Sequence, residues 1–96
     1  MCYSSKIVCH IQLNHANKYY RMQILKEDST GLYYVWLKWG RVGESSVGRD
    51  LQGPSRYENT AIRIFFKKYK VKTGNAFDTE EFIPKHGKYI PVDNQS

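Results

Sequence analysis

The run most prone to form a β-strand is Leu32-Tyr33-Tyr34-Val35-Trp36-Leu37-Lys38-Trp39. It is rich in aromatic and branched residues, which favour a pleated strand. Apolar or aromatic side chains fall on both of its faces, so we expect a central strand, covered on one side by a helix and on the other by further chain. The polar turn Glu27–Gly31 precedes this run and predicts a hairpin with the strand before it.

Two earlier segments show the alternation of a strand with one buried face. Apolar residues alternate with more polar ones over residues 6–13, which predicts a first strand. Turn formers occupy residues 14–18, and the alternation resumes over residues 19–26, with Tyr20 and Met22 on the same side. The second of these segments should therefore pair with the run that starts at Leu32.

The second half of the chain predicts one helix. Gly40, Gly43 and Gly48 indicate a loop-rich segment after the run, which should include a short strand over Val47–Leu51. Ser55 and Glu58 form an S-x-x-E pattern, which predicts that a helix begins there through a capping box. It should end near Thr73, with Gly74 as its left-handed cap. An apolar stripe of this helix faces the sheet and is made of Ala61, Ile62, Phe65, Phe66 and Tyr69.

The tail from Asn75 to Ser96 has isolated apolar anchors between prolines and a glycine, and predicts a short helix and an edge strand. We expect disorder in its last few residues. The fold class is therefore α+β: an antiparallel sheet of about four to five strands with one main amphipathic helix packed on it. Residues 1–96 are expected to form a single domain with its core at about residues 6–92.

The charge of the chain indicates a polyanionic partner. There are 15 Lys and Arg against 9 Asp and Glu, a formal charge of +6 on 96 residues. Such a surplus attracts nucleic acid. Ordinary solubility is the alternative explanation, since many small domains carry a charge of this size.

Other classes of protein are disfavoured. No apolar stretch is long enough to span a bilayer, and no secretory signal is visible. Catalysis, a cofactor and a bound metal are not expected, because the chain has no glycine-rich phosphate loop and no nucleophile with a paired base. The potential zinc ligands are Cys2, Cys9, His10 and His15, and their spacing matches no familiar zinc site. Cys9 and His10 should also point to opposite faces of a strand.

The most informative stretch is Lys38-Trp39-Gly40-Arg41-Val42-Gly43. It places an aromatic ring and two cations at a strand end, beside glycines that let another backbone approach closely. An indole can stack on an exposed base or sugar. A DNA end or a nick offers such a group, and a continuous duplex does not. The alternative is structural: Trp39 caps the hydrophobic core, and Arg41 is a solvated charge.

These residues resemble a known family. Trp39-Gly40-Arg41-Val42-Gly43 looks like the signature of the WGR domain found in DNA-dependent poly(ADP-ribose) polymerases. Three further stretches are similar to the family in the same order: Asn17-Lys18-Tyr19-Tyr20 followed by Gln23-Ile24-Leu25, then Lys72-Thr73-Gly74-Asn75, then Gly87-Lys88-Tyr89. The likeness covers most of residues 6–92. Phe77 stands where the family commonly has Trp, which keeps the ring and loses the indole donor.

The resemblance implies a module, not itself an enzyme, that recognises DNA breaks and relays DNA occupancy to adjoining helical and catalytic domains of a polymerase. It implies nuclear localisation, a role in DNA repair, and binding to nicks or ends near a 5′ phosphate. Trp39 would stack on the terminal sugar, and Arg41 would bridge DNA to neighbouring domains. Phosphate contacts would come from Asn17, Lys18, Lys38, Lys72 and Tyr89.

Each role has a structural alternative, such as a turn for Asn17 or the helix dipole for Lys72. Two other functions also stay open. One is a protein-interaction module whose exposed aromatics contact another domain. The other is a binder of single strands or structured RNA, since stacking and phosphate contacts suit those ligands too.

Overall fold

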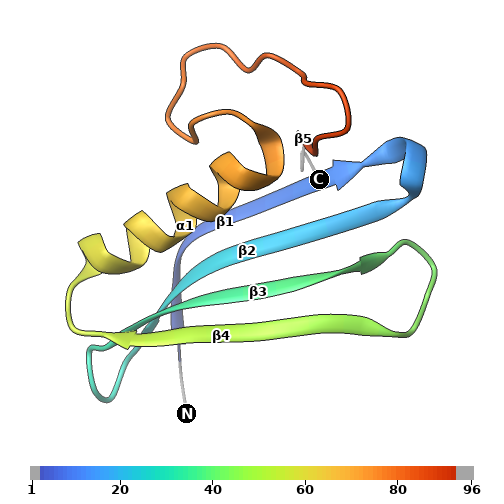
Figure 1. The fold of residues 1–96 in the computed structure, drawn as a ribbon. Coiled ribbons are helices and arrows are strands. Elements are labelled where there is room, and N and C mark those ends of the chain that lie inside the picture. Colours follow the sequence, from blue (N-terminus) through green and yellow to red (C-terminus); the bar gives the residue numbers. More distant parts are fainter. Residues whose placement is uncertain (1–2, 93–96) are drawn as a thin grey trace.

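In the computed structural model, which describes residues 3–92, one antiparallel sheet carries one helix on one face (Figure 1). The strands run in the order β4-β3-β2-β1-β5. Their bounds are β1 Tyr3–Leu13, β2 Lys18–Glu27, β3 Tyr33–Arg41, β4 Val47–Ser55 and β5 Ile90–Pro91, with helix α1 at Glu58–Thr73 and a 3-10 turn, η1, at Asn14–Ala16. The predicted α+β class, with an antiparallel sheet of five strands and one main helix, is confirmed.

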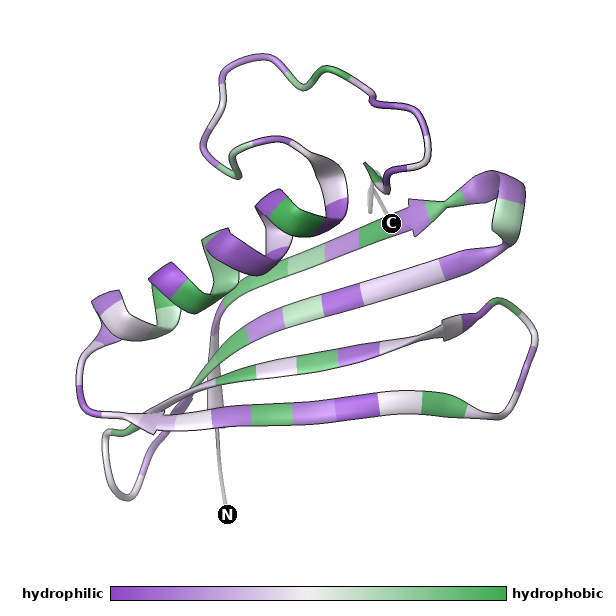
Figure 2. Cartoon of the chain, in the orientation of Figure 1, coloured by the Kyte–Doolittle hydropathy of each residue, from purple (hydrophilic) through white to green (hydrophobic). Residues whose placement is uncertain are grey.

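The first three strands form where the sequence predicted them, two from their alternation and β3 from its β-prone composition. Strands β2 and β3 make the expected hairpin, with Tyr20 opposite Trp39 and Met22 opposite Leu37. Bands of opposite hydropathy alternate along the strands in Figure 2, as expected for a sheet with one buried face. The helix-facing positions of β2, such as Tyr20 and Met22, are buried.

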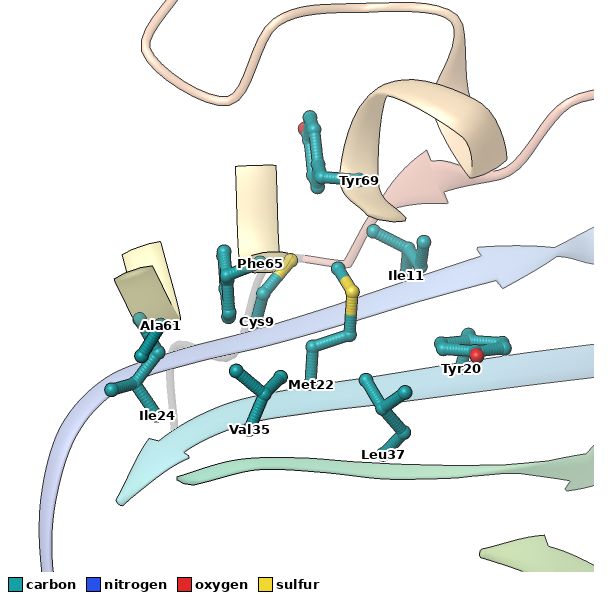
Figure 3. Close-up of a cluster of buried hydrophobic side chains, with 10 residues drawn as sticks. All are labelled: Cys9, Ile11, Tyr20, Met22, Ile24, Val35, Leu37, Ala61, Phe65 and Tyr69. Carbon is teal, nitrogen blue, oxygen red and sulfur yellow. The ribbon is translucent and has the colours of Figure 1, made fainter. Parts of the chain in front are cut away.

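The core lies between the sheet and α1. Buried helix residues recur every fourth position, at Ala61, Phe65, Tyr69 and Thr73. Phe65 is fully buried and belongs to the cluster in Figure 3, where its burial contributes about 2–3 kcal/mol of transfer free energy. The predicted apolar stripe is thus confirmed, and its opposite side is exposed at Arg63, Lys67 and Lys70.

The predicted start of the helix is wrong. Ser55 is not a cap but the last residue of β4, paired with Tyr33 across the ladder, so the strand runs four residues past Leu51. The helix begins at Glu58, and Tyr57 precedes it in an extended conformation with no side-chain cap. Backbone pairing with β3 takes precedence over the local capping pattern. The helix end is as predicted, with Gly74 left-handed (φ 73°) and its N–H donating to the carbonyl of Lys70.

The expected cover on the second face of the sheet is also wrong. Helix α1 and the segment that follows it lie on the same side, and no element among residues 3–92 packs on the other face (Figure 1). The aromatic and apolar side chains on the outer face of β3 therefore stay partly exposed, as at Tyr34 and Trp36.

The tail returns across the helix to the edge of β1. Strand β5 pairs with Ile11 and Gln12 and confirms the expected edge strand, whereas no helix forms between residues 75 and 92. The rings of Phe65, Tyr69 and Phe77 meet edge to face with centroids 5.0 Å apart in each pair that includes Phe77. The ring of Phe77 therefore packs on the buried side of the helix. The disorder expected in the last few residues falls largely on 93–96, outside the described part of the chain.

Asn75 ties this tail to the end of the helix. Its buried side-chain amide donates to the carbonyls of Thr73 (3.0 Å) and Ile83 (2.9 Å), and its side-chain oxygen accepts from the N–H of Ile83 (3.0 Å). These bonds tie the irregular segment to the helix end, alongside the core contacts of Phe77 and Phe82. The path of residues 75–90 starts at this junction and ends at the sheet edge.

Candidate nucleic-acid interface

A groove of about 690 Å³ opens between the β3–β4 end of the sheet and the last turns of α1. Strands β2, β3 and β4, the helix and the tail all contribute to its walls. It brings together most of the binding residues predicted from the sequence: Lys18, Trp39, Arg41, Lys72 and Tyr89. Residues far apart in the chain therefore converge on one surface.

Trp39 lies in the floor of the groove and also packs on the core. Its cross-strand partners are Tyr20 on β2 and Gly48 on β4. The indole is nearly parallel to the Tyr20 ring, with centroids 5.5 Å apart and an interplanar angle of 10°. A Cβ added to Gly48 would lie 2.2 Å from the indole, so the missing side chain of Gly48 leaves the room that the ring occupies. The structural and the binding interpretations of Trp39 are therefore compatible.

We expect Gly48→Ala to move the indole. Gly48 has no left-handed backbone, so the added methyl itself, and not backbone strain, forces the ring to shift. The expected cost is about 2 kcal/mol of stability, as for overpacking of a tight site. The shift should appear as a changed Trp39 indole resonance in NMR spectra and as weaker binding to nicked DNA.

Gly40→Ala is the matched control, because Gly40 neighbours Trp39 in the chain but a Cβ there would meet Tyr19 and Val47 at 3.3 Å. That contact is tight but much looser than the one at Gly48. Equal changes in the Trp39 resonance for both variants would contradict the role assigned to Gly48.

Lys72 stands over the aromatic floor. Its ammonium lies 4.8 Å from the centroid of the Tyr20 ring and 5.9 Å from that of Tyr89, both within the range of cation–π attraction. Burial lowers the pKa of Lys72, and the nearby charges of Lys68, Lys18 and Lys88 lower it further. The free protein thus holds a group of mutually repelling cations, which a phosphate would neutralise.

Lys68 is a groove residue that the sequence interpretation missed. It lines the groove one helical turn before Lys72, and a spacing of four residues places both side chains on the same helix edge. That spacing was the signal available in the sequence. The groove holds four cations, Lys18, Arg41, Lys68 and Lys72, against one carboxylate, Glu44.

Tyr89 reaches the groove only because the tail folds back. Its backbone N–H donates to the carbonyl of Lys72 (2.9 Å), and its ring meets Tyr20 edge to face at 6.1 Å. Burial raises the pKa of the Tyr89 hydroxyl. A neutral phenol in this position can donate a hydrogen bond to a phosphate oxygen.

Asn17 and Lys38 do not line the groove. Asn17 closes the turn after η1 with left-handed backbone (φ 53°), and its carbonyl accepts the N–H of Val42 at 2.7 Å. It therefore anchors the loop that follows Arg41. Lys38 points to the opposite face of the sheet, where it lines a smaller hollow with His10 and Arg21. Their contacts with DNA stay predictions.

Those possible zinc ligands that the structure describes lie away from the groove. Cys9 is buried in the core, and burial raises its pKa to about 11, which keeps the thiol protonated and unreactive. His10 lies on the other face of the sheet, as the alternation indicated, and Cys2 lies outside the described residues. Among residues 3–92, no group of three or more potential metal ligands comes together, and no helix is long and apolar enough to cross a membrane.

Comparison with known proteins places this geometry in context. The family model described as the WGR domain matches residues 6–83. The chain is 41% identical over 81 residues to human poly(ADP-ribose) polymerase 2 and 40% identical over 74 residues to the Arabidopsis thaliana protein of that name. It is also 35% identical over 77 residues to Xenopus laevis poly(ADP-ribose) polymerase 1.

These alignments cover 83%, 76% and 80% of the chain but only 14%, 12% and 8% of the respective relatives. The chain therefore spans a small part of each relative. The family match ends before residues 87–89, so the position of Tyr89 in the groove rests on the structure alone.

Proposed function

The chain belongs to the WGR domain family, and we propose that it is a DNA-binding regulatory module that recognises strand breaks. The observation that carries the proposal is the convergence of Lys18, Lys68 and Lys72 around an aromatic floor that includes Trp39. Cations supply affinity for phosphates, and an aromatic ring distinguishes an end from continuous duplex.

Phosphate binding follows from the repulsion among the lysines. Each of them lies near other cations, and the groove offers one carboxylate in return. A phosphate in the groove removes that repulsion, so binding should be strong at low salt and weaken steeply as salt rises. A 5′ phosphate at a nick carries more charge than an internal one, which favours a break over intact duplex.

Trp39 supplies the discrimination. The ring is held by Tyr20 and Gly48 and does not need to be ordered when DNA binds, which lowers the entropic cost of stacking. The terminal sugar or base at a break can lie against its exposed part. Internal nucleotides of a duplex are stacked on their neighbours and offer no such surface.

We propose further that the 96 residues act as one domain of a longer nuclear polymerase, in DNA repair. The relatives are named poly(ADP-ribose) polymerases, and the chain itself supplies only the WGR part. Arg41, exposed at the rim of the groove, would then contact both DNA and an adjoining helical or catalytic domain. Occupancy of the groove would bias that domain toward its active state and so control ADP-ribosylation.

The test compares a nicked duplex with a break-free duplex closed at both ends. Fluorescence anisotropy at about 50 mM and about 200 mM salt should show tighter binding to the nick, with a steep salt dependence. Trp39→Ala should lower affinity for the nick about tenfold, as for loss of one stacked nucleotide, and should remove the preference.

Trp36→Ala is the matched control, because Trp36 lies on β3 three residues away and faces the other side of the sheet. It should leave the preference for the nick unchanged. Circular dichroism checks that both variants fold. Equal weak binding of the wild type to nicked and closed duplex, or no binding to either, would overturn break recognition and favour the protein-interaction module instead.

A further inference from the structure

The face of the sheet opposite α1 carries a straight row of cations. Arg21 on β2 pairs with Lys38 on β3, and Lys38 pairs with Arg49 on β4. His10 on β1, which is neutral in the formal charge count, is the partner of Arg21 and lies at the end of this row. Directly paired side chains in antiparallel strands lie about 5 Å apart, so Arg21, Lys38 and Arg49 form one cationic line across three strands.

This arrangement costs stability. Like charges directly opposite one another on neighbouring strands destabilise a sheet. In the strand pairings of residues 3–92, no carboxylate lies opposite Arg21, Lys38 or Arg49. Asp50, the acidic residue of β4, is the partner of the buried Leu37 and therefore faces the helix side. A binding partner that carries negative charge would offset this repulsion.

Aromatic and apolar groups flank the cationic row. On one side, Trp36 pairs with Leu51, which is 43% exposed. On the other side, Tyr19 lies beside a hollow of about 290 Å³ that also involves His10, Arg21 and Lys38. The face thus offers rings on both sides of a line of positive charge, with no chain among the described residues covering it.

We propose that this open sheet face, defined by Tyr19, Arg21, Trp36, Lys38 and Arg49, is a second nucleic-acid site that binds single strands. The cations follow the phosphates, while Trp36 and Tyr19 stack unpaired bases. A duplex fits the face less well because its bases are already stacked and paired. The site is separate from the groove, since Trp36 and Trp39 project from opposite faces of β3.

The two tryptophans of the chain make the test direct. NMR spectra of the ¹⁵N-labelled protein contain an indole signal from each of the two sites. A fluorescent oligothymidylate of about 12 nucleotides should shift the Trp36 signal, and a nicked duplex the Trp39 signal. Comparing the affinity of oligothymidylate with that of oligouridylate of the same length shows whether the face binds single-stranded DNA or RNA better.

Variants then separate the two faces. Arg21→Gln with Lys38→Gln should reduce affinity for oligothymidylate about 25-fold at about 0.1 M salt. Each lost phosphate contact lowers the slope of log affinity against log salt by about 0.7, so two losses lower it by about 1.4. Trp36→Leu should reduce it about tenfold. Lys67→Gln with Lys70→Gln removes the same charge from the exposed side of α1 and should have little effect.

The proposal fails if neither oligonucleotide binds, if binding shifts Trp39 and leaves Trp36 unchanged, or if the Lys67 and Lys70 variant weakens binding as much as the Arg21 and Lys38 variant. Binding to the nicked duplex is read from the Trp39 signal and from groove variants. If the open face fails to bind single strands, the proposed break recognition still stands. If the groove fails to bind the nick, the proposal for the open face still stands.

Discussion

Replacing Lys18, Lys68 and Lys72 together by glutamine is expected to lower affinity for nicked duplex about 500-fold at about 0.1 M salt. The three ammonium groups line one groove. Each phosphate contact contributes about 0.9 to the slope of log affinity against log salt, so three losses reduce the slope by about 2.7. Fluorescence anisotropy over a salt series measures both quantities.

The same substitutions should leave the fold intact or stabilise it. Burial and the charges of Lys68 and Lys18 lower the pKa of Lys72, which means that the folded protein disfavours its protonated form. Below its folded pKa, this lysine therefore destabilises the fold, and glutamine removes that penalty. The melting temperature at neutral pH should be equal to or above that of the wild type.

A charge-matched control uses the exposed side of α1. Arg63→Gln, Lys67→Gln and Lys70→Gln remove the same charge at positions that point away from the groove. Their effect on affinity should be smaller than tenfold, because it comes only from the long-range field. Comparable losses for the two triple variants would show that net charge, and not the groove, provides the binding.

Asn75→Ala should destabilise the protein by about 3 kcal/mol, because it leaves the N–H and carbonyl of Ile83 without their partner. For a chain of this size, that loss corresponds to a fall of about 12–24 °C in melting temperature. The tail also loses its tie to the helix end, so the ring of Tyr89 should be less ordered over Tyr20. Thermal denaturation and the aromatic NMR signals report the two effects.

Asn59→Ala provides the comparison. Asn59 is exposed in the first turn of α1, so the same substitution there should change the melting temperature by a few degrees at most. If Asn75→Ala has an equally small effect, the junction described between Asn75 and Ile83 does not hold the tail.

Most of the sheet could be predicted, because alternation indicates a buried face and a run of aromatic and branched residues favours a strand. The strands around Tyr20 and Val35 appear where the pattern placed them. The start of the helix could not be predicted from Ser55 and Glu58, because a local pattern does not reveal that Ser55 has a strand partner in Tyr33. Ser55 could cap the helix or extend β4, and its long-range pairing with Tyr33 favours the strand.

The site shows the same limit. Adjacent residues Lys38 and Trp39 were assigned to one surface, yet neighbours in a strand point to opposite faces, and alternation from Leu37 onward already indicated this. Lys68 could have been found from its spacing to Lys72. The approach of Tyr89 could not, because it depends on the irregular path between Asn75 and the edge of β1.

The order of strands β4-β3-β2-β1 has a bearing on how the protein folds. Each of these strands pairs with its neighbour in the sequence, so the sheet can grow hairpin by hairpin with short loops to close. The pairing of β5 with Ile11 and Gln12 joins residues 78 and 80 positions apart and carries a larger entropic cost of closure. We therefore expect the sheet to assemble early and the groove wall formed by Tyr89 to be completed last, which makes that wall the part of the site most easily opened in the native state.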